Sequence, residues 1–535
     1  MRRETLPIDA LAAWTRLNNI EFHGVEVKRL ETGDGVDKGS AVVSTETIST
    51  QQINAEAQAQ PKILMTVPRD LILSLESVEI YAKSDRHLKE VLDAVGDYAR
   101  TARGAILIFL LVHISYSDAE LSSKEHIRMS SAWTEYVKFL PEPLPLPTFY
   151  TIEERELLHG TSLELALDAK IASLEKEFND LREATMDIKW CNRYWWHEET
   201  GRLTFEDWKL VDALYRSRSL EFPGIGHVMV PCLDMTNHAS NDLTNALYEV
   251  DGGGNAVLQL HWGRTLGKGD EVTITYGDEK GAAEMIFSYG FLENGLTKAR
   301  QLFLDLDIPC DDPLLPPKKA VCDDAPGFLL FSTDSGATDW ESRFVWWCCV
   351  NEEDGLEFRV LQSNQGQREL RVSWKGTDIG PSEPLVEQLK KDPMWELFQL
   401  RAVVILQDRI TNQLARLRTS DEYVRRWLEY VDETIIRRSV WDTAIKLREL
   451  EGELLEAGLH DIEIKVPSSS HCFAVLPPRV LSLLPYLGNP LPRQTRRKTA
   501  AWHTFGQKLQ LLNREPVRVY LETQNPGAGI TEDFS

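Results

Sequence analysis

The stretch PCLDMTNHAS, residues 231–240, gathers carboxylate, amide and imidazole side chains directly after an apolar run. That run, HVMVPCL from His227 to Leu233, is typical of a buried strand. Polar groups at the exit of a strand often form an ordinary turn, but they can also face a ligand. The amide of Asn237 has donors and an acceptor that suit the ammonium or carboxylate group of a small zwitterion. His238 could pack on a flat ring and leave the edge of that ring to backbone groups.

Two tyrosines follow in the segment EVTITYGDEKGAAEMIFSYGF. Tyr276 stands at the end of a β-branched strand, and Tyr289 lies on a short helical stretch that returns to the same region. Either tyrosine alone is more often a packing residue than a functional one. A pair of them near one polar bend indicates a channel lined with hydroxyl groups.

Strand patterns and helix patterns alternate in blocks along the chain. Strands are predicted before residue 75, in VEVKRL, SAVVST and ILMTVP, and again after residue 226, in NALYEV, AVLQLHW and EVTITYG. Residues 76–204 between them have the apolar spacing of helices, and Thr204 followed by Asp207 is typical of a helix start. This order predicts a β domain whose chain is interrupted by a helical insertion.

Two further regions complete the expected organisation. The apolar run AILIFLLVHI, Ala105 to Ile114, is too short to span a membrane and predicts a buried helix. From residue 296 onward, MWELFQLRAVVILQDRITNQLARLR and SVWDTAIKLRELEGELLEAG predict long helices, and FRVLQSN, LRVSW and HCFAVLP predict strands.

Composition limits the class of protein. The chain has 535 residues, 42% apolar and 27% charged, which is ordinary for a globular protein of several domains. Its net charge of -24 argues against a nucleic-acid partner and suits a basic protein partner. The seven cysteines lie at irregular spacings without a CxxC pair, so we expect neither a disulfide framework nor a metal site. The start, MRRETLPIDALAAW, lacks a secretory signal, and we expect a monomer in the cytoplasm or nucleus with no membrane partner.

The motifs DMTNH, GDEVTITYG and AEMIFSYGF, in this order, resemble the SET-domain methyltransferases. Within them, the chain is similar to the branch of the Rubisco large-subunit lysine methyltransferase, the ribosomal-protein lysine methyltransferases and the actin-histidine methyltransferase. MTVPRDLILS, Met65 to Ser74, the segment SAWTEYVKFLPEPLPLPTFYTIEERELLHGTSL from Ser131, and LYRSRSL, which ends at Leu220, resemble other marks of that branch. The resemblance covers roughly residues 20–295.

The resemblance implies an α+β fold. It would contain a SET β-fold with a pseudoknot, in which the strand after the NH pair threads under a loop. A helical insertion would interrupt this domain, and a mainly α-helical C-terminal domain, a candidate for substrate binding, would follow it. The implied boundaries are residues 1–75 and 205–295 for the SET domain, 76–204 for the insertion and 296–535 for the last domain.

The resemblance also implies S-adenosylmethionine as the methyl donor and a protein side chain that enters from the opposite face. The implied cofactor-binding residues are Lys38, Gly39, Ser40, Ser217, Arg218, Asn237, His238 and Tyr276. Asp234, Tyr248 and Tyr289 match residues that line the substrate channel. Tyr276 matches the central catalytic tyrosine, whose hydroxyl would aim the lone pair of a neutral amine at the methyl carbon.

Three functional hypotheses follow. The first is a protein-lysine N-methyltransferase for a non-histone target, such as a ribosomal or translation protein. The second is a protein-histidine methyltransferase, which needs a channel that fits a flat ring and selects its tautomer. The third is a SET-derived binding module with impaired catalysis. It is motivated by Ala41, which replaces the second glycine of the first cofactor loop and would be strained if that position required a positive φ.

Overall fold

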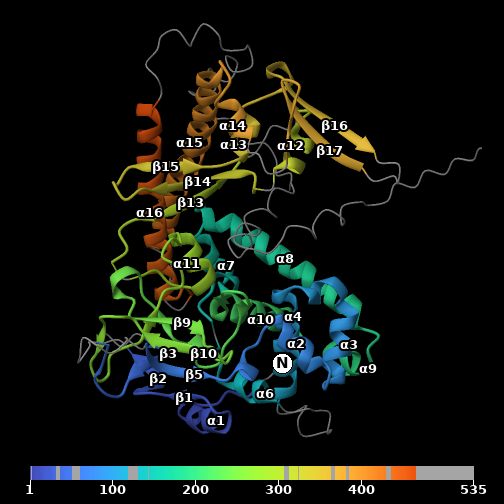
Figure 1. The fold of residues 1–535 in the computed structure, drawn as a ribbon, viewed down its shortest axis with the longest axis vertical. Coiled ribbons are helices and arrows are strands. Elements are labelled where there is room, and N and C mark those ends of the chain that lie inside the picture. Colours follow the sequence, from blue (N-terminus) through green and yellow to red (C-terminus); the bar gives the residue numbers. More distant parts are fainter. Residues whose placement is uncertain are drawn as a thin grey trace, which may run out of the picture. The chain divides into compact units, whose positions relative to one another are not determined.

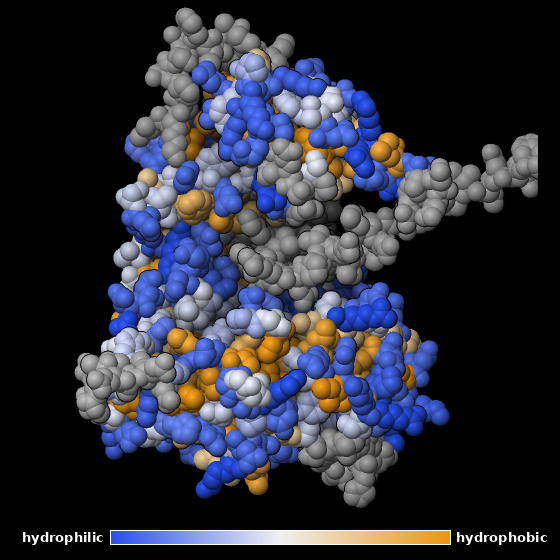
Figure 2. Space-filling view, in the orientation of Figure 1, coloured by the Kyte–Doolittle hydropathy of each residue, from blue (hydrophilic) through white to orange (hydrophobic). Residues whose placement is uncertain are grey.

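The computed structural model describes residues 1, 3–31, 37–50, 61–118, 131–142, 144–293, 295–306, 312–322, 324–362, 368–380, 385–428 and 435–465 (Figure 1). The chain forms two compact units. The first unit contains Met1–Arg155, Lys170–Leu296 and Glu433–Thr443. The second contains Glu156–Ala169, Thr297–Asp432 and the described residues from Ala444 onward. On the face that Figure 2 presents, hydrophilic residues cover most of the surface.

Short antiparallel strands form the β part of the first unit. The largest sheet has the order β1-β5-β10-β9, and among the described residues three antiparallel two-stranded pairs and one parallel pair accompany it. Its members are β1 (Glu21–Phe22), β5 (Lys62–Val67), β9 (Ala246–Val250) and β10 (Ala256–Leu260). The antiparallel pairs are β2 (Val25–Glu31) with β3 (Asp37–Ser44), β4 (Ile48–Ser49) with β11 (Thr265–Leu266), and β6 (Leu220–Phe222) with β7 (Gly226–Val228). The strands predicted from VEVKRL, SAVVST, ILMTVP, NALYEV and AVLQLHW are confirmed.

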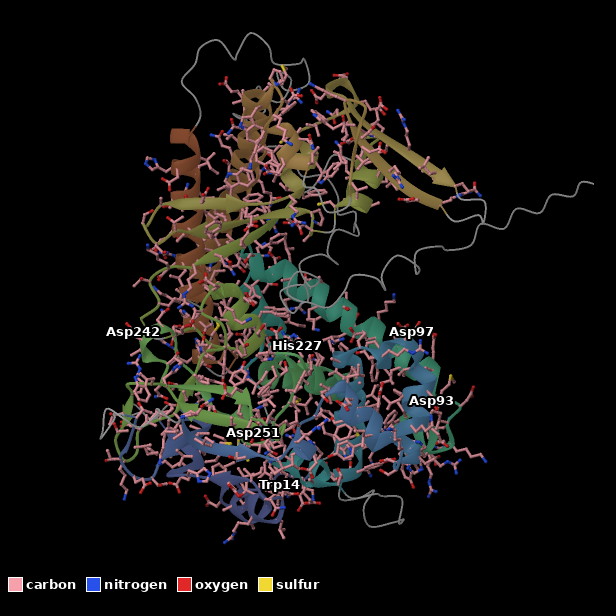
Figure 3. The ribbon with its side chains drawn as sticks, viewed as in Figure 1. Trp14, Asp93, Asp97, His227, Asp242 and Asp251 are labelled. Carbon is pink, nitrogen blue, oxygen red and sulfur yellow. The ribbon has the colours of Figure 1, made fainter. Side chains whose placement is uncertain are left out.

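The turn between β9 and β10 is closed by an aspartate side chain. The carboxylate of Asp251, labelled in Figure 3, accepts hydrogen bonds from the backbone N–H groups of Gly253 and Asn255, both at 2.8 Å. An aspartate that bonds the backbone two residues onward is a common way to close a tight turn.

The strand predicted over His227–Leu233 is shorter than expected. β7 ends at Val228, and only a single bridge from Met229 to Leu73 continues it. Pro231 has no N–H to donate to a ladder, and Cys232 has a φ of +68° that no strand accommodates. The chain therefore turns before the polar cluster, and the short 3-10 helix Leu233–Met235 follows.

One parallel pair distinguishes this unit. β8 (Asn237–His238) lies beside β12 (Thr273–Ile274), with Asn237 opposite Thr273 and His238 opposite Ile274. The backbone N–H of Ala239 extends the pairing by donating to the Ile274 carbonyl at 3.0 Å. This strand pair brings the bend at Asn237 and His238, called the NH bend below, beside β12, the strand that leads to Tyr276.

Helices surround these strands. In the first unit and its junctions they are α1 (Leu11–Leu17), α2 (Leu75–Ala82), α3 (Arg86–Val95), α4 (Ala102–Ser117), α6 (Ala132–Tyr136), α7 (Ile152–Glu156), α8 (Ser162–Thr185), α9 (Lys189–Cys191), α10 (Phe205–Arg218) and α11 (Ala282–Tyr289). The predicted start of α10 is confirmed, because Thr204 and Asp207 form a reciprocal capping box. The buried helix predicted from AILIFLLVHI is α4, whose residues are buried from Gly104 to Ser117. In the described part of the chain, no helix has both the length and the apolar character that crossing a bilayer requires.

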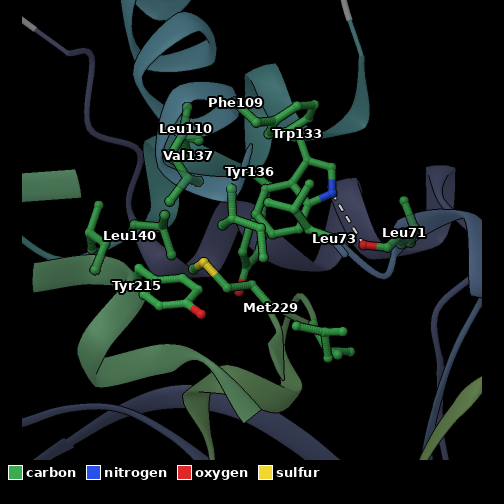
Figure 4. Close-up of a cluster of buried hydrophobic side chains, with 14 of the residues drawn as sticks. Leu71, Leu73, Phe109, Leu110, Trp133, Tyr136, Val137, Leu140, Tyr215 and Met229 are labelled. Atoms are coloured by element: carbon green, nitrogen blue, oxygen red, sulfur yellow. Dashed lines mark hydrogen bonds between the residues drawn. The ribbon is translucent and has the colours of Figure 1, made fainter. Parts of the chain in front are cut away.

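Large side chains of the helical insertion pack directly on the β segments of the first unit (Figure 4). Trp133 and Tyr136 of α6 are buried beside Leu73 and Met229, and the Trp133 indole donates to the Leu71 carbonyl at 3.2 Å. Burial of such aromatic side chains contributes several kcal/mol, roughly 3–5 kcal/mol for a Trp truncated to Ala. The insertion is therefore part of the core that holds the strands, rather than an appendage.

The second unit combines two long helices with two small sheets. Its helices are α12 (Leu315–Val321), α13 (Phe344–Cys348), α14 (Leu385–Leu389), α15 (Trp395–Leu428) and most of α16 (Arg438–Lys465). One sheet contains β13 (Gln301–Asp305), β14 (Gly327–Ser332) and β15 (Thr338–Glu341), and the other β16 (Leu356–Gln362), β17 (Arg368–Trp374) and β18 (Thr377–Ile379). The two long helices and the strands from FRVLQSN and LRVSW are confirmed. The sheet β13–β15 was not predicted, and HCFAVLP lies outside the described residues.

A piece of the predicted insertion belongs to the second unit. The segment Glu156–Ala169 lies within the range 76–204 that the sequence assigned to one block, yet it packs with α15 and α16. Arg448 donates to the carbonyls of Leu157 and His159, and Glu451 accepts from Ser162. These buried polar contacts tie the segment to the second unit.

Candidate active site

The NH bend and Tyr276 meet, as the sequence analysis required. Tyr276 follows β12 by two residues, so the parallel register with β8 carries it next to His238. The Tyr276 backbone N–H donates to Nδ1 of His238 at 3.0 Å, and the two rings stack with centroids 5.0 Å apart at 25°. The side chain of His238 is 0% exposed. The imidazole thus packs on a flat ring, but that ring belongs to the protein.

The phenol of Tyr276 points at a backbone carbonyl. Its hydroxyl donates to the oxygen of Thr236 at 2.8 Å, and its ring lies 4.5 Å from the ring of Tyr289. Burial, opposed by the nearby charge of Arg218, raises the pKa of Tyr276 well above its ordinary value. At neutral pH the residue is a neutral phenol that can donate one hydrogen bond and accept others.

Two further tyrosines lie in the same part of the first unit. Tyr289 ends α11 immediately before Gly290, whose left-handed φ of +82° forms the helix C-cap. Burial raises the pKa of Tyr289, with smaller contributions from Tyr276, Glu284 and Tyr248. Tyr248 packs on Phe222 with ring centroids 5.0 Å apart, and burial raises its pKa as well. The structure therefore packs the Tyr276 ring against the tilted ring of Tyr289 and brings Tyr248 within electrostatic reach of Tyr289.

Arg218 and Asp234 form a buried pair. Nη1 of Arg218 donates to the backbone oxygen of Asp234 at 2.9 Å and to its carboxylate at 3.3 Å. The other carboxylate oxygen accepts from the hydroxyl of Tyr136 at 2.5 Å, and that hydroxyl accepts from the N–H of Cys232 at 2.8 Å. The Asp234 side chain is 1% exposed, and in the structure it contacts Arg218, which it holds in place.

The remaining predicted side chains differ in their surroundings. Asn237 donates through its amide to Glu271 at 2.7 Å, which fixes the amide orientation. The hydroxyl of Ser217 donates to the Ala213 carbonyl of its own helix at 2.7 Å. Because that bond lies within α10, the hydroxyl of Ser217 makes no hydrogen bond to the other predicted site residues among those described.

The loop residues Lys38, Gly39 and Ser40 lie in β3. The strand runs beside the segment that contains Glu271, because the Val272 N–H donates to the Val42 carbonyl at 2.8 Å and Val43 bridges Glu271. Gly39 has a φ of +76°, and no heavy atom lies within 4 Å of where its Cβ would be. Ala41 is absent from the described residues with positive φ and pairs with Lys28 in the β2–β3 ladder. The strain considered for Ala41 therefore does not arise.

The sequence analysis missed several side chains that complete the site. Tyr136, Thr236 and Glu271 contact the predicted residues as described above, and Glu293 accepts from Nε2 of His238 at 2.8 Å. Thr236 and Glu271 lie inside the motifs DMTNH and GDEVTITYG, and Glu293 follows the SYGF motif by two residues, so these three had a local signal. Tyr136 is 98 residues from Asp234 along the chain, and no short-range pattern marks such a contact.

The donor set fits a zwitterionic cofactor. Nε of Arg218 and the hydroxyl oxygen of Thr236 are buried atoms that have no hydrogen-bond partner within the described ranges. A buried donor without an acceptor costs about 1–3 kcal/mol, which a bound carboxylate would relieve. With the open side of Gly39 and the amide of Asn237, these groups have the chemistry to hold the amino-acid end of S-adenosylmethionine.

This fold and site are similar to those of the SET-domain protein methyltransferases, and comparison with known proteins agrees. SET domain-containing protein 8 of Schizosaccharomyces pombe is 26% identical over 346 residues, 63% of this chain and 74% of that protein. The actin-histidine N-methyltransferase of Xenopus tropicalis is 22% identical over 84% of this chain and 68% of its own length. No family profile matches the chain.

Among solved structures, the SET domain of LSMT bound to lysine and AdoHcy matches with a TM-score of 0.57 and 18% identity. The match covers 89% of this chain and 98% of that one. At this identity the likeness shows the shared fold. It confirms the α+β SET architecture and, together with the SET-domain relatives, the resemblance that the motifs indicated.

Proposed function

We propose that this chain is an S-adenosylmethionine-dependent protein-lysine N-methyltransferase acting on a non-histone protein. The observation that carries the proposal is the position of Tyr276, with its hydroxyl on the Thr236 carbonyl and its ring in contact with those of His238 and Tyr289. A structural neighbour that holds lysine and AdoHcy supports both the donor and the side chain that accepts the methyl group.

The cofactor would be held from the side of Arg218, by the spare guanidinium donor, the Asn237 amide and the Gly39–Ser40 backbone. When bound, S-adenosylmethionine supplies a methyl carbon that its sulfonium activates. The protein's own task is then positioning and electrostatics rather than acid–base chemistry. We assign Arg218 and Asn237 to binding, and Tyr276 to the reacting atoms.

On the acceptor side, the neutral phenol of Tyr276 and the Thr236 carbonyl would orient the lysine amine. A lysine must lose its proton before it can attack, and an aromatic, water-poor site lowers the pKa of an entering ammonium group. The amine lone pair then forms the new C–N bond while the S–C bond breaks. Tyr289, whose ring contacts that of Tyr276, would line the channel and exclude water.

The target is proposed from charge. A net charge of -24 favours encounter with basic proteins, and ribosomal or translation proteins are basic and abundant in the cytoplasm and nucleus. Incubation of a deletion-strain extract with the enzyme and labelled cofactor, followed by peptide mapping, would identify the labelled protein. Labelling spread evenly over many acidic proteins would contradict the proposed target class.

The direct test of the site is the substitution Tyr276→Phe. We expect turnover to fall by roughly 10²–10³-fold, the usual cost of removing one positioned polar group, while cofactor affinity measured by calorimetry changes little. The wild-type protein should bind S-adenosylmethionine and transfer its methyl group. Binding without any transfer would instead favour the catalytically impaired binding module. Near-normal turnover by Tyr276→Phe would remove the catalytic assignment.

A second candidate is methylation of histidine. It is favoured by the similarity to the actin-histidine N-methyltransferase, which extends over 84% of this chain. Lysine and histidine products differ after total hydrolysis, so amino-acid analysis of the labelled protein separates them. Methylhistidine as the labelled product would replace lysine in the proposal and leave the cofactor and Tyr276 assignments standing.

A further inference from the structure

The imidazole of His238 uses both of its nitrogens inside the protein. Nδ1 accepts the backbone N–H of Tyr276 at 3.0 Å, so in the neutral ring the proton resides on Nε2. Nε2 lies 2.8 Å from a carboxylate oxygen of Glu293 and donates to it. The ring is therefore held in one tautomer by two partners from different segments of the chain.

The carboxylate of Glu293 is itself fixed. Its second oxygen accepts from the hydroxyl of Ser240 at 2.5 Å. Ser240 and His238 belong to the same bend, whereas Glu293 follows Gly290, the C-cap of the helix that ends at Tyr289. One carboxylate thus joins the NH bend to the segment that leaves the second tyrosine.

We propose that Glu293 is a positioning residue for methyl transfer. By holding the Nε2–H tautomer of His238, it keeps Nδ1 as the acceptor for the Tyr276 N–H. It thereby keeps the Tyr276 hydroxyl aligned with the Thr236 carbonyl. The inference rests on the proposed function of Tyr276 and adds the group that fixes the backbone of that residue.

The alternative tautomer shows why the carboxylate matters. A proton on Nδ1 would face the N–H of Tyr276, so two donors would oppose each other in a buried place. The backbone of Tyr276 would then move away from His238, and the stacked ring would move with it. Without Glu293, the Nε2–H keeps only the more distant hydroxyl of Ser240 at 3.5 Å, and the Tyr276 N–H alone holds the productive tautomer.

The test compares Glu293→Ala with Glu293→Gln. Glutamine keeps an acceptor for Nε2–H without the charge, so we expect it to restore most of the activity that alanine loses. For alanine we expect kcat to fall roughly tenfold or more, with the KM for S-adenosylmethionine within about twofold of the wild-type value. Glu79→Ala, at an exposed position of α2, serves as the matched control and should behave as wild type.

Nitrogen NMR of the histidine-labelled full chain supplies a readout that simple destabilisation does not move. The His238 signals should report a proton on Nε2 in the wild type and in Glu293→Gln, and a mixture of tautomers in Glu293→Ala. An unchanged tautomer and unchanged kcat in Glu293→Ala would overturn the inference, as would a loss confined to KM. A wild-type chain without any methyl transfer would instead overturn the proposed function and, with it, the catalytic part of this inference.

Discussion

Helix α10 carries two buried charge clusters, one at Asp212 and one at Arg218, six residues apart. They differ in the partners that surround each charge. At Asp212, one carboxylate oxygen accepts from Arg103 and from Lys170, each at 2.7 Å, and the other lies 3.6 Å from Nε of Arg216. At Arg218, the guanidinium pairs with Asp234, and Tyr136 donates to the other oxygen of that carboxylate.

The two clusters also differ in their buried polar atoms that make no hydrogen bond within the described residues. In the first cluster, Oδ2 of Asp212 and Nε of Arg216 are the buried atoms for which the described part of the chain offers no hydrogen bond, and they face each other as an ion pair 3.6 Å apart. In the second, Nε of Arg218 is buried with no acceptor within the described residues. Burial of charge is common to both clusters, so it does not identify a site. A spare buried donor distinguishes Arg218 from Arg216, and a bound carboxylate would satisfy it.

Breaking the cluster at Asp212, which we interpret as a structural scaffold, should have the largest effect on stability. Burial opposes the charge of Asp212, yet Lys170, Arg103 and Arg216 hold its pKa well below the usual range, so the carboxylate is ionised and supports all three cations. Asp212→Ala should lower the free energy of unfolding by about 3–5 kcal/mol, because it leaves buried cations without their partner. Chemical denaturation measures this loss. Cofactor affinity of the folded variant should be nearly unchanged, and a loss below about 1 kcal/mol would mean that the cluster is not a scaffold.

The same cluster should make stability depend on pH. Burial lowers the pKa of Lys170 from its ordinary value of 10.5 to about 8, with Asp212 opposing the shift. Between these pH values the unfolded chain binds the proton and the folded chain does not, so the free energy of unfolding rises as the pH increases from about 8 to 10.5. The gain attributable to Lys170 is at most about 3 kcal/mol.

The measurement is the stability of wild type relative to Lys170→Met, determined from pH 7 upward. We expect the difference to move in favour of the wild type as the pH rises through this window. A difference that stays flat would show that the neighbouring carboxylates keep the ammonium group charged in the folded state.

At the Arg218 cluster the effect should fall on binding instead. Arg218→Lys keeps a cation for Asp234 but removes the spare Nε donor and the planar fork of the guanidinium. We expect affinity for S-adenosylmethionine to fall roughly ten- to a hundredfold, equivalent to about 1.5–3 kcal/mol for a charge-assisted hydrogen bond. The melting temperature should change by only a few degrees. An unchanged affinity by calorimetry would place the cofactor carboxylate elsewhere.

The contrast between the clusters also marks how far the sequence could go. The capping box of α10, the buried α4 and the strands that flank the site follow from patterns within a few residues, and these were predicted. The meeting of His238 with Tyr276 was predicted too, from the tyrosines that follow the polar bend and from the resemblance. Tyr136 and Glu293 were missed because their contacts join segments 98 and 55 residues apart. Arg216 and Arg218 belong to the same short motif, RSR. Which of the two has a spare donor depends on the surroundings in the fold, so the sequence could not show it.

The smallest expected effect tests whether the helical insertion tunes the cofactor site through Tyr136. Tyr136→Phe keeps the buried ring beside Trp133 but removes the hydroxyl that joins Asp234 to the Cys232 N–H. We expect the free energy of unfolding to fall by about 1 kcal/mol, the usual value of one hydrogen bond. Burial already raises the pKa of Asp234, and loss of the phenol donor should raise that pKa further. As the pH falls, cofactor binding should therefore begin to weaken at a higher pH in Tyr136→Phe than in the wild type.

The chain offers a close control for this substitution. Tyr116 is also buried and donates to a carboxylate, that of Asp85, at 3.1 Å, but neither residue contacts the site. Tyr116→Phe should cost a similar amount of stability and leave the pH dependence of cofactor binding unchanged. If both variants shifted that dependence equally, the effect would be general loosening of the first unit. If only Tyr136→Phe did, the insertion would act on Arg218 through Asp234, by way of a hydroxyl that donates to the aspartate carboxylate itself.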